Sequence, residues 1–184
     1  GSTVNSIKCY VYDHDAGDNA LPFMTHDIEI KNVGSKRGNH YDFTFVKGKT
    51  YDLVFLATAV DQTNPDSKVY YNPTLRTLNV DYAASKTNDE EMDCFFGVLP
   101  NLSDKSEKAL SVTLKRPFAQ LNIGAKDLAK YNIQSVGVSV DGVYSSMNIM
   151  DGSVAGDPVK AVFASNFLPS GQSFPVTGCD YLSM

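Results

Sequence analysis

Short segments in which apolar and polar residues alternate recur along the whole chain, separated by turn-forming residues at intervals of roughly 8 to 15 residues. Alternation with a period of two places the apolar side chains on one face, which is typical of a half-buried β-strand. The pattern predicts an all-β fold: an antiparallel β-sandwich of the transthyretin-like or Ig-like Greek-key type, with one or two short helices. The 184 residues can bury a proper core. We expect residues 1–184 to form a single β-sandwich domain, either alone or as the N-terminal part of a longer two-domain protein.

The segment Ser111–Ile123 shows this alternation most clearly. Val112 and Leu114 occupy one phase, whereas Leu121 belongs to the other, so the register changes by one residue near Pro117. A proline cannot donate to a sheet ladder and is tolerated at bulges and edges. The pattern therefore predicts one central strand over Ser111–Ile123 with a bulge near Pro117.

Two further segments carry specific signals. Thr50–Val60 is apolar in both phases, which predicts a strand covered on both faces, either in the middle of a sandwich or at a subunit contact. Asp141-Gly142 is a preferred type I′ turn pair, so Val136–Val140 and Val143–Met150 are predicted to form a hairpin. Other strands are predicted at Ile7–Asp13, Leu21–Val33, near Tyr41 with Phe43 and Phe45 inward, at Leu78–Tyr82, Val159–Ala164, Phe174–Val176 and Tyr181–Met184, with helical turns at Asn88–Glu91 and Lys126–Tyr131.

Composition narrows the classes of partner. The net charge is −5, the lysines are scattered among acids, and no apolar run is long enough to span a bilayer. This charge distribution argues against nucleic acid and an anionic membrane surface as partners. Cys9, Cys94 and Cys179 are odd in number and far apart, which favours buried thiols over a disulfide framework or a zinc site.

Two neighbouring motifs carry a resemblance to a known family. Asp93-Cys-Phe-Phe-Gly97 followed by Leu114-Lys-Arg-Pro-Phe-Ala-Gln-Leu-Asn-Ile123 resembles the paired signature of Bacteroidetes fimbrillin-like proteins, the shaft, tip and anchor subunits of type V surface pili. In that family an acidic-aromatic-glycine segment leads into a strand of the form Leu-x-Arg-x-x-Ala-x-Leu/Val-x-Ile/Val. The closing Tyr181-Leu-Ser-Met184 is similar to the family's Tyr-Leu-x-Met segment, so the match spans most of the chain.

The resemblance implies a structural role at the cell surface or outer membrane, with export as a lipoprotein. The lipid-modified cysteine would lie upstream of residue 1. Whether the native chain continues past Met184 stays open. Partners would be other pilin subunits, held by donor-strand insertion, in which main-chain hydrogen bonds and alternate side chains join two subunits. Host or bacterial surface ligands are further expected partners. The shaft, tip or anchor role and the accepting sheet edge stay open. Arg37, Arg76 and Arg116 are candidate maturation sites.

No catalytic residue, metal ligand set or cofactor site is expected. His14, His26 and His40 lie in or near polar loops, without the spacing of a metal or nucleophile motif. Asp13, Asp15 and Asp18 are weak candidates for a cation site, and a solvated loop is the favoured reading of the same residues. We therefore expect the chain not to be an enzyme.

A carbohydrate-binding module of a glycan-uptake system is the alternative function. Its sugar-stacking residues would be Tyr70, Tyr71 and Tyr82. The absence of tryptophan counts against it.

Overall fold

A computed structural model describes residues 4, 6–33, 36–38, 41–59, 68–84, 92–119, 122–125, 135–167 and 180–183. Apart from the short 3-10 turn η1, the elements within these residues are strands, as the alternation predicted. The elements are β1 (Ser6–Asp13), η1 (His14–Ala16), β2 (Met24–Ile28), β3 (Lys31–Val33), β4 (Lys36–Gly38), β5 (Thr50–Thr58), β6 (Val69–Asn72), β7 (Thr77–Val80), β8 (Cys94–Ser103), β9 (Asn122–Ala125), β10 (Ser135–Val143), β11 (Ser146–Asn148), β12 (Val154–Ala155), β13 (Val159–Phe167) and β14 (Asp180–Ser183).

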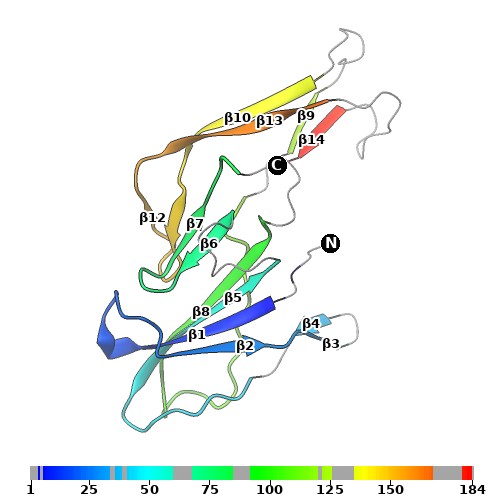
Figure 1. Ribbon diagram of the computed structural model, residues 1–184. Helices are drawn as coiled ribbons and strands as arrows, with labels where there is room; N and C mark the ends of the chain where they lie inside the picture. Colours follow the sequence, from blue (N-terminus) through cyan, green and yellow to red (C-terminus); the bar gives the residue numbers. More distant parts are fainter. Residues whose placement is uncertain are drawn as a thin grey trace.

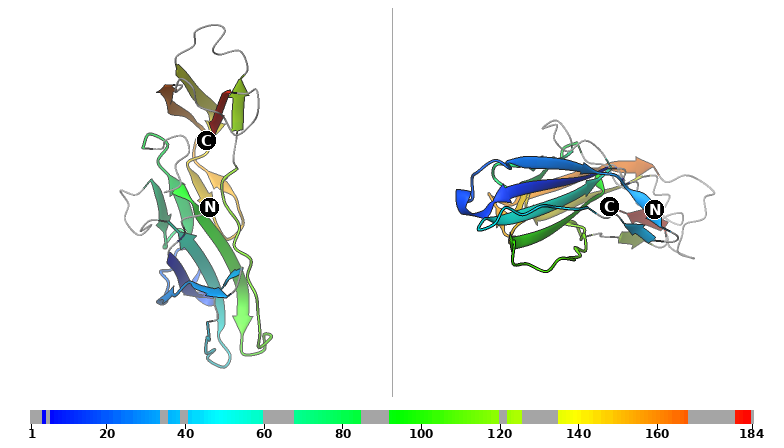
Figure 2. Two further views of the ribbon diagram at one scale, coloured as in Figure 1. Left: turned by 90° about the vertical axis from the view of Figure 1, so that its right-hand side faces the viewer. Right: turned by 90° about the horizontal axis from the view of Figure 1, so that it is seen from below.

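Two four-stranded sheets form the main body. Their strand orders are β2-β1-β5-β8 and β12-β11-β7-β6, and the strand pairs in both sheets are antiparallel. The two-stranded pairs β10-β13 and β14-β9 lie at the other end of the molecule from β1 and β2 (Figure 1). The molecule is therefore elongated, as the side view in Figure 2 also shows.

The principal core lies between the two four-stranded sheets. Its buried side chains come from both sheets, so the sheets pack face to face as in a sandwich. Tyr12 and Leu56 from the first sheet and Tyr71 and Leu78 from the second are among its largest fully buried members. Among the described residues, its buried members are Tyr10, Tyr12, Val54, Leu56, Val69, Tyr71, Leu78, Cys94 and Ile149.

A second apolar cluster covers the opposite face of the first sheet. Cys9 and Val11 of β1 pack there with Tyr51 and Leu53 of β5 and with Leu102. β5 therefore contributes side chains to both clusters, which confirms the prediction of a strand buried on both faces. The rings of Phe43 and Phe45 also pack against this cluster.

The segment Ser111–Ile123 is not one central strand, and this prediction was wrong. Residues 111–119 form a single β-bridge, between Lys115 and Phe96, and β9 begins only at Asn122. Pro117 lacks an N–H group, so it cannot donate to a further ladder pair two residues after Lys115. The inner strands of this sheet are β1 and β5 instead.

The predicted hairpin at Asp141-Gly142 was also wrong. β10 continues through these residues and pairs with β13, with a register shift between Val140 and Val143. Gly142 has a φ of 78°, which suits a bulge as well as a type I′ turn. After Val143 the chain enters β11, which pairs with β7 and β12.

Other strand predictions were confirmed in part. Strands form at the segments predicted around Ile7, Leu78, Val159 and Tyr181, whereas the segment 21–33 divides into β2 and β3. Residues 41–46 form no strand, although Phe43 and Phe45 do point inward. The predictions for Asn88–Glu91, Lys126–Tyr131, Phe174–Val176, His40 and Cys179 lie outside the described residues.

Cys9 and Cys94 are buried thiols, as predicted. Burial raises the pKa of the Cys9 thiol to about 12. Within the described ranges, no helix has the length and apolar character to cross a membrane.

Candidate functional site

The two motifs that resemble the fimbrillin signature lie against each other. The backbone groups of Phe96 and Lys115 exchange two hydrogen bonds, of 2.9 and 2.8 Å. One residue further along, the guanidinium of Arg116 lies 2.9 Å from a carboxylate oxygen of Asp93 and 5.1 Å from the ring centre of Phe95. The acidic, aromatic and basic positions of the signature therefore form one contact.

The glycine of the signature is explained by close packing. A Cβ atom on Gly97 would lie 2.5 Å from Cγ2 of Val112 and 2.9 Å from Cδ2 of Leu114. Real Cβ atoms essentially never approach other atoms so closely, so a side chain at residue 97 would push the facing segment away. Two branched aliphatic side chains occupy the space that Gly97 leaves.

We call residues Ser111–Lys115 the strap. The strap runs beside β8, which is an edge strand of its sheet, and the register set by Phe96 and Lys115 would place Thr113 opposite Val98. Among the described residues, no backbone hydrogen bond joins Val98 to Thr113. Pro100 follows on the same edge of β8 and carries no N–H to donate. The strap therefore covers the β8 edge while making a single pair of ladder hydrogen bonds.

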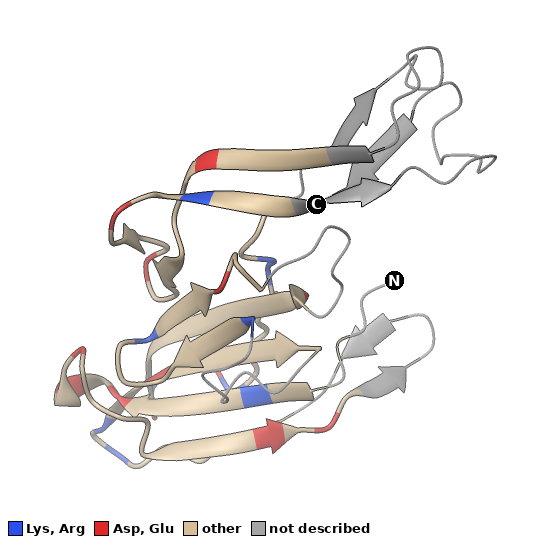
Figure 3. Cartoon of the chain, turned by 45° about the horizontal axis from the view of Figure 1, so that its top comes forward, with Lys and Arg blue, Asp and Glu red and all other residues tan. Residues whose placement is uncertain are grey.

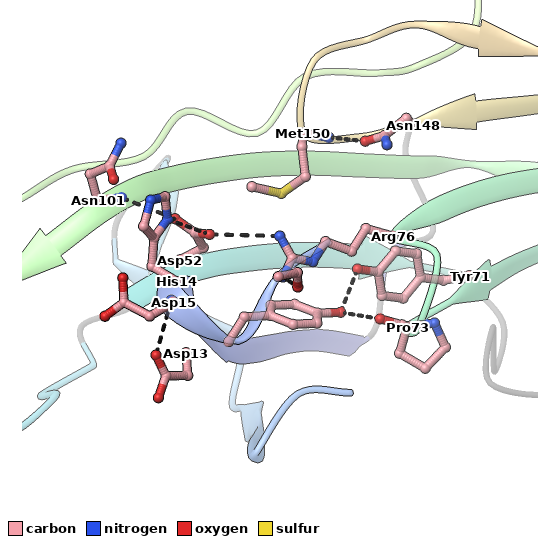
Figure 4. A network of polar contacts seen from close by, with 12 residues as sticks. Asp13, His14, Asp15, Asp52, Tyr71, Pro73, Arg76, Asn101, Asn148 and Met150 are labelled. Carbon is pink, nitrogen blue, oxygen red and sulfur yellow. Dashed lines mark hydrogen bonds and ion pairs between the residues drawn. The ribbon is translucent and has the colours of Figure 1, made fainter. Parts of the chain in front are cut away.

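A buried polar network lies near the opposite end of β8 and is centred on Asp52 of β5 (Figure 4). Asp52 is 3% exposed, and its carboxylate accepts a hydrogen bond of 3.0 Å from the backbone N–H of Asn101. His14 Nδ1 lies 2.9 Å from the same oxygen, and Arg76 Nη1 lies 3.6 Å from the other. Asn101 has a φ of 57° at the register shift between β5 and β8, so the bulge aims its N–H at Asp52.

Arg76 joins this carboxylate to the second sheet. Its Nη2 donates to the carbonyl oxygen of Gly17 at 3.1 Å, and its guanidinium lies 4.3 Å from the ring centre of Tyr12. Its backbone carbonyl accepts from the N–H of Ile149 at 3.0 Å. In the described residues, Arg76 Nε is the buried side-chain nitrogen or oxygen that lacks a partner. The network therefore links β1, β5, β8 and the β6–β7 turn across the core.

Tyr12 and Tyr71 complete the network. The Tyr12 hydroxyl donates to the carbonyl of Pro73 at 2.8 Å, so its oxygen is left to accept from the Tyr71 hydroxyl, also at 2.8 Å. Burial raises the pKa of Tyr12 to about 12, although the hydrogen bond with Tyr71 and the charge of Arg76 lower it. Burial also raises the pKa of Tyr71. Both hydroxyls therefore stay neutral at ordinary pH and act as hydrogen-bonding groups between the sheets.

The aspartate-rich loop does not gather a metal ligand set in the part of the chain that the structure describes, where no three His, Cys, Asp or Glu residues are placed to hold an ion. Asp13 forms an ion pair with Lys49 at 3.1 Å and accepts from the N–H of Asp15. These two contacts hold the pKa of Asp13 below its usual value. Asp15 and Asp18 are exposed.

Of the three tyrosines proposed to stack on sugars, Tyr71 is buried. Tyr71 is 1% exposed and bonded within the core, so the prediction that it is available to a ligand was wrong. Tyr70 and Tyr82 are half-buried, and the Tyr82 hydroxyl donates to the backbone oxygen of Tyr144. Figure 3 shows acidic and basic residues interspersed over the described strands and loops, without a basic stretch among them.

The three candidate maturation sites differ in accessibility. Arg76 is 4% exposed and paired within the core, so this candidate site is not available to a protease. Arg116 is exposed, although its guanidinium is held by Asp93. The side chain of Arg37 lies outside the described part.

The sequence reading missed Asp52 and Arg76 as network residues. A signal for Asp52 was present, because it is the one charged residue within Thr50–Thr58, a strand predicted to be buried on both faces. A buried carboxylate needs partners, so cationic residues near the sheet should have been sought. No comparable signal marked Arg76, whose turn position suggested exposure.

Comparison with known proteins gave one family and one solved structure. The model of a family described as "Family of unknown function (DUF6562)" matches residues 7–182. No curated protein matches the chain. A crystal structure of a fimbrial assembly protein from Parabacteroides distasonis is similar, with a TM-score of 0.39 and 16% sequence identity over 97% of this chain and 69% of that chain.

Proposed function

The chain belongs to the DUF6562 family, whose function is not known, and from this premise we propose that it is a structural, non-catalytic subunit or accessory protein of a cell-surface pilus. In this role the β-sandwich is a building block, and its work is polymerisation by β-strand addition and adhesion. Export as a lipoprotein to the outer membrane belongs to the same proposal.

The contact between the two signature motifs carries the proposal. Asp93, Phe95 and Gly97 could match a family pattern by chance if they lay far from Leu114 and Arg116. Instead each has a partner in the second motif: Asp93 and Phe95 contact Arg116, and Gly97 makes room for Leu114. A pattern whose members depend on one another physically supports a shared structural unit.

The form of the sheets also supports assembly through strand addition. A sandwich that grows by this route needs an edge at which main-chain groups can pair with a neighbour. β8 and β2 are the edge strands of the first sheet, and β6 and β12 those of the second. The described strands thus offer several edges.

Immunogold electron microscopy of intact cells that express the full-length protein tests this function. We expect gold particles on the cell surface, along filaments or at their bases, and none on cells that lack the gene. Protease added to intact cells should digest the protein. A protein that stays protected inside intact cells would overturn the proposed pilus role.

A further inference from the structure

Among the described residues, the backbone of the strap is hydrogen-bonded to β8 at one end only. At its C-terminal end, Lys115 bonds to Phe96 and Arg116 pairs with Asp93. Towards its N-terminal end it makes no backbone bond to Val98, and the preceding residue, Leu110, is 44% exposed. An element with one pair of ladder bonds can open locally at much lower cost than a fully paired strand.

The surface beneath the strap has a definite shape. Gly97 leaves a hollow on one face of β8. The side chains of Val112 and Leu114, which are two residues apart in the strap, fill this hollow. That spacing places both side chains on the same face of an extended segment. The backbone groups of Phe96 and Val98 supply the polar part of the surface, and the Asp93 carboxylate supplies its negative end.

We propose that the outer edge of β8 is a binding site for an extended segment of a neighbouring subunit, and that the strap is its built-in occupant, which the incoming segment displaces. The fitting segment carries two branched aliphatic residues two positions apart and a basic residue two positions after the second, as Val112, Leu114 and Arg116 do. The identity of the donor as another subunit rests on the proposed function.

An incoming segment can form backbone hydrogen bonds to β8 that the strap does not form. It can pair with the Val98 backbone groups in addition to those of Phe96, and each added pair of bonds contributes to stability. The strap competes because it is tethered, with an effective concentration on the order of millimolar. Binding in trans should therefore be weak in the unmodified chain and strong once the strap is loosened. Pro100 limits the length of the site, because it cannot donate to a further pair.

Peptide binding tests the site without requiring filaments. The probe is a fluorescein-labelled peptide with the sequence of residues 109–118, titrated against the full chain and followed by fluorescence anisotropy. Arg116→Gln removes the ion pair at the C-terminal end of the strap. The double variant Val112→Ser, Leu114→Ser removes the apolar packing of the strap against Gly97. We expect Arg116→Gln to bind the peptide about two- to fivefold more tightly than the unmodified chain, and the double variant to bind it more tightly still. Lys160→Gln, at an exposed ion pair on β13, is the matched control and should bind as the unmodified chain does.

A further substitution separates site binding from unspecific sticking. Adding Gly97→Val to Arg116→Gln fills the hollow and should abolish binding in a chain that keeps its circular dichroism spectrum. Equal binding by the unmodified and loosened chains, no binding by either, or unchanged binding after Gly97→Val would each overturn the proposal.

A disulfide lock distinguishes this proposal from the pilus function. Val98→Cys with Thr113→Cys joins the strap to β8, and Lys8→Cys with Asp27→Cys, facing positions of β1 and β2, is the control lock. Oxidation of the first lock should abolish peptide binding and reduction should restore it, whereas the control should have no effect.

If the oxidised strap lock still forms filaments, another edge accepts the donor strand. If the peptide displaces the strap and no filaments form under any condition, the site stands and the pilus function fails.

Discussion

Asp93 and Arg116, which are 23 residues apart in the sequence, form an ion pair with an N–O distance of 2.9 Å. The pair closes the end of the strap over β8 and stacks the guanidinium near the Phe95 ring. It is the point at which the two halves of the signature become one structural unit.

Arg116→Gln should lower the free energy of unfolding by about 0.5–1 kcal/mol, because it removes a partly exposed ion pair and a cation–π contact. Urea unfolding measures the change. Lys160→Gln is the control, since its pair with Asp141 is 3.6 Å long and both side chains are more than half exposed. A loss from Arg116→Gln no larger than that from Lys160→Gln would show that the Asp93–Arg116 ion pair contributes nothing to stability.

Gly97→Ala should destabilise the fold by about 1–3 kcal/mol, because the new methyl group overlaps Val112 and Leu114. Val112→Ala should relieve part of this cost, so the two substitutions combined should destabilise less than the sum of the single variants. A double-mutant cycle in urea measures that coupling. Strict additivity would mean that Gly97 and Val112 do not touch in solution.

Asp52→Asn should cost about 3–5 kcal/mol, because it leaves the buried Arg76 guanidinium without its counter-charge. Asp27→Asn is the matched control: its carboxylate also pairs with a cation, Lys8, but is 80% exposed, so a change near zero is expected. Thermal and urea unfolding compare the two. Similar small losses from both variants would rule out a tightly paired Asp52.

Stability should fall as the pH rises above 9. The folded-state pKa values of Cys9 and Tyr12 are raised to about 12, from ordinary values of 9.0 and 10.0. Above the ordinary values the unfolded chain loses these protons while the folded chain keeps them, so stability is full below pH 9 and is lost towards pH 12. Cys9→Ala should move the onset of the loss from near pH 9 to near pH 10. A melting temperature that does not change between pH 9 and 12 would contradict both raised values.

The strands that local pattern defines were predictable. β5 is apolar in both phases, and burial on both faces follows directly from that pattern. β1 and β13 were located for a similar reason, because alternation requires no knowledge of the partner strand.

Pairing was less predictable, because it depends on distant residues. The Asp141-Gly142 pair is compatible with both a hairpin turn and a bulge. Which of the two forms depends on the partner strand β13, which pairs with β10 on both sides of these residues. The strap has the alternation of a strand, yet the proline after it and the sparse bonding to β8 keep it out of the ladder. Alternation reports which side chains face inward and does not report whether backbone bonds form.

The site was predictable only through the resemblance. The motif spacing placed Asp93 and Arg116 in one signature, but nothing in the local pattern said that they touch. The network at Asp52 depends on a bulge at Asn101 and a turn at Arg76, both with positive φ at residues other than glycine. Such positions are rare, and although asparagine is enriched among them, nothing in the sequence marks an arginine such as Arg76 for this conformation.

Assembly of the full mature protein tests the pilus account most directly. Light scattering and negative-stain microscopy should be applied before and after limited proteolysis near its N-terminus. The account predicts filaments or ladders of strand-exchanged subunits, with the released segment identifying the donor groove. A protein that remains monomeric under every condition would contradict a role as a polymerising subunit.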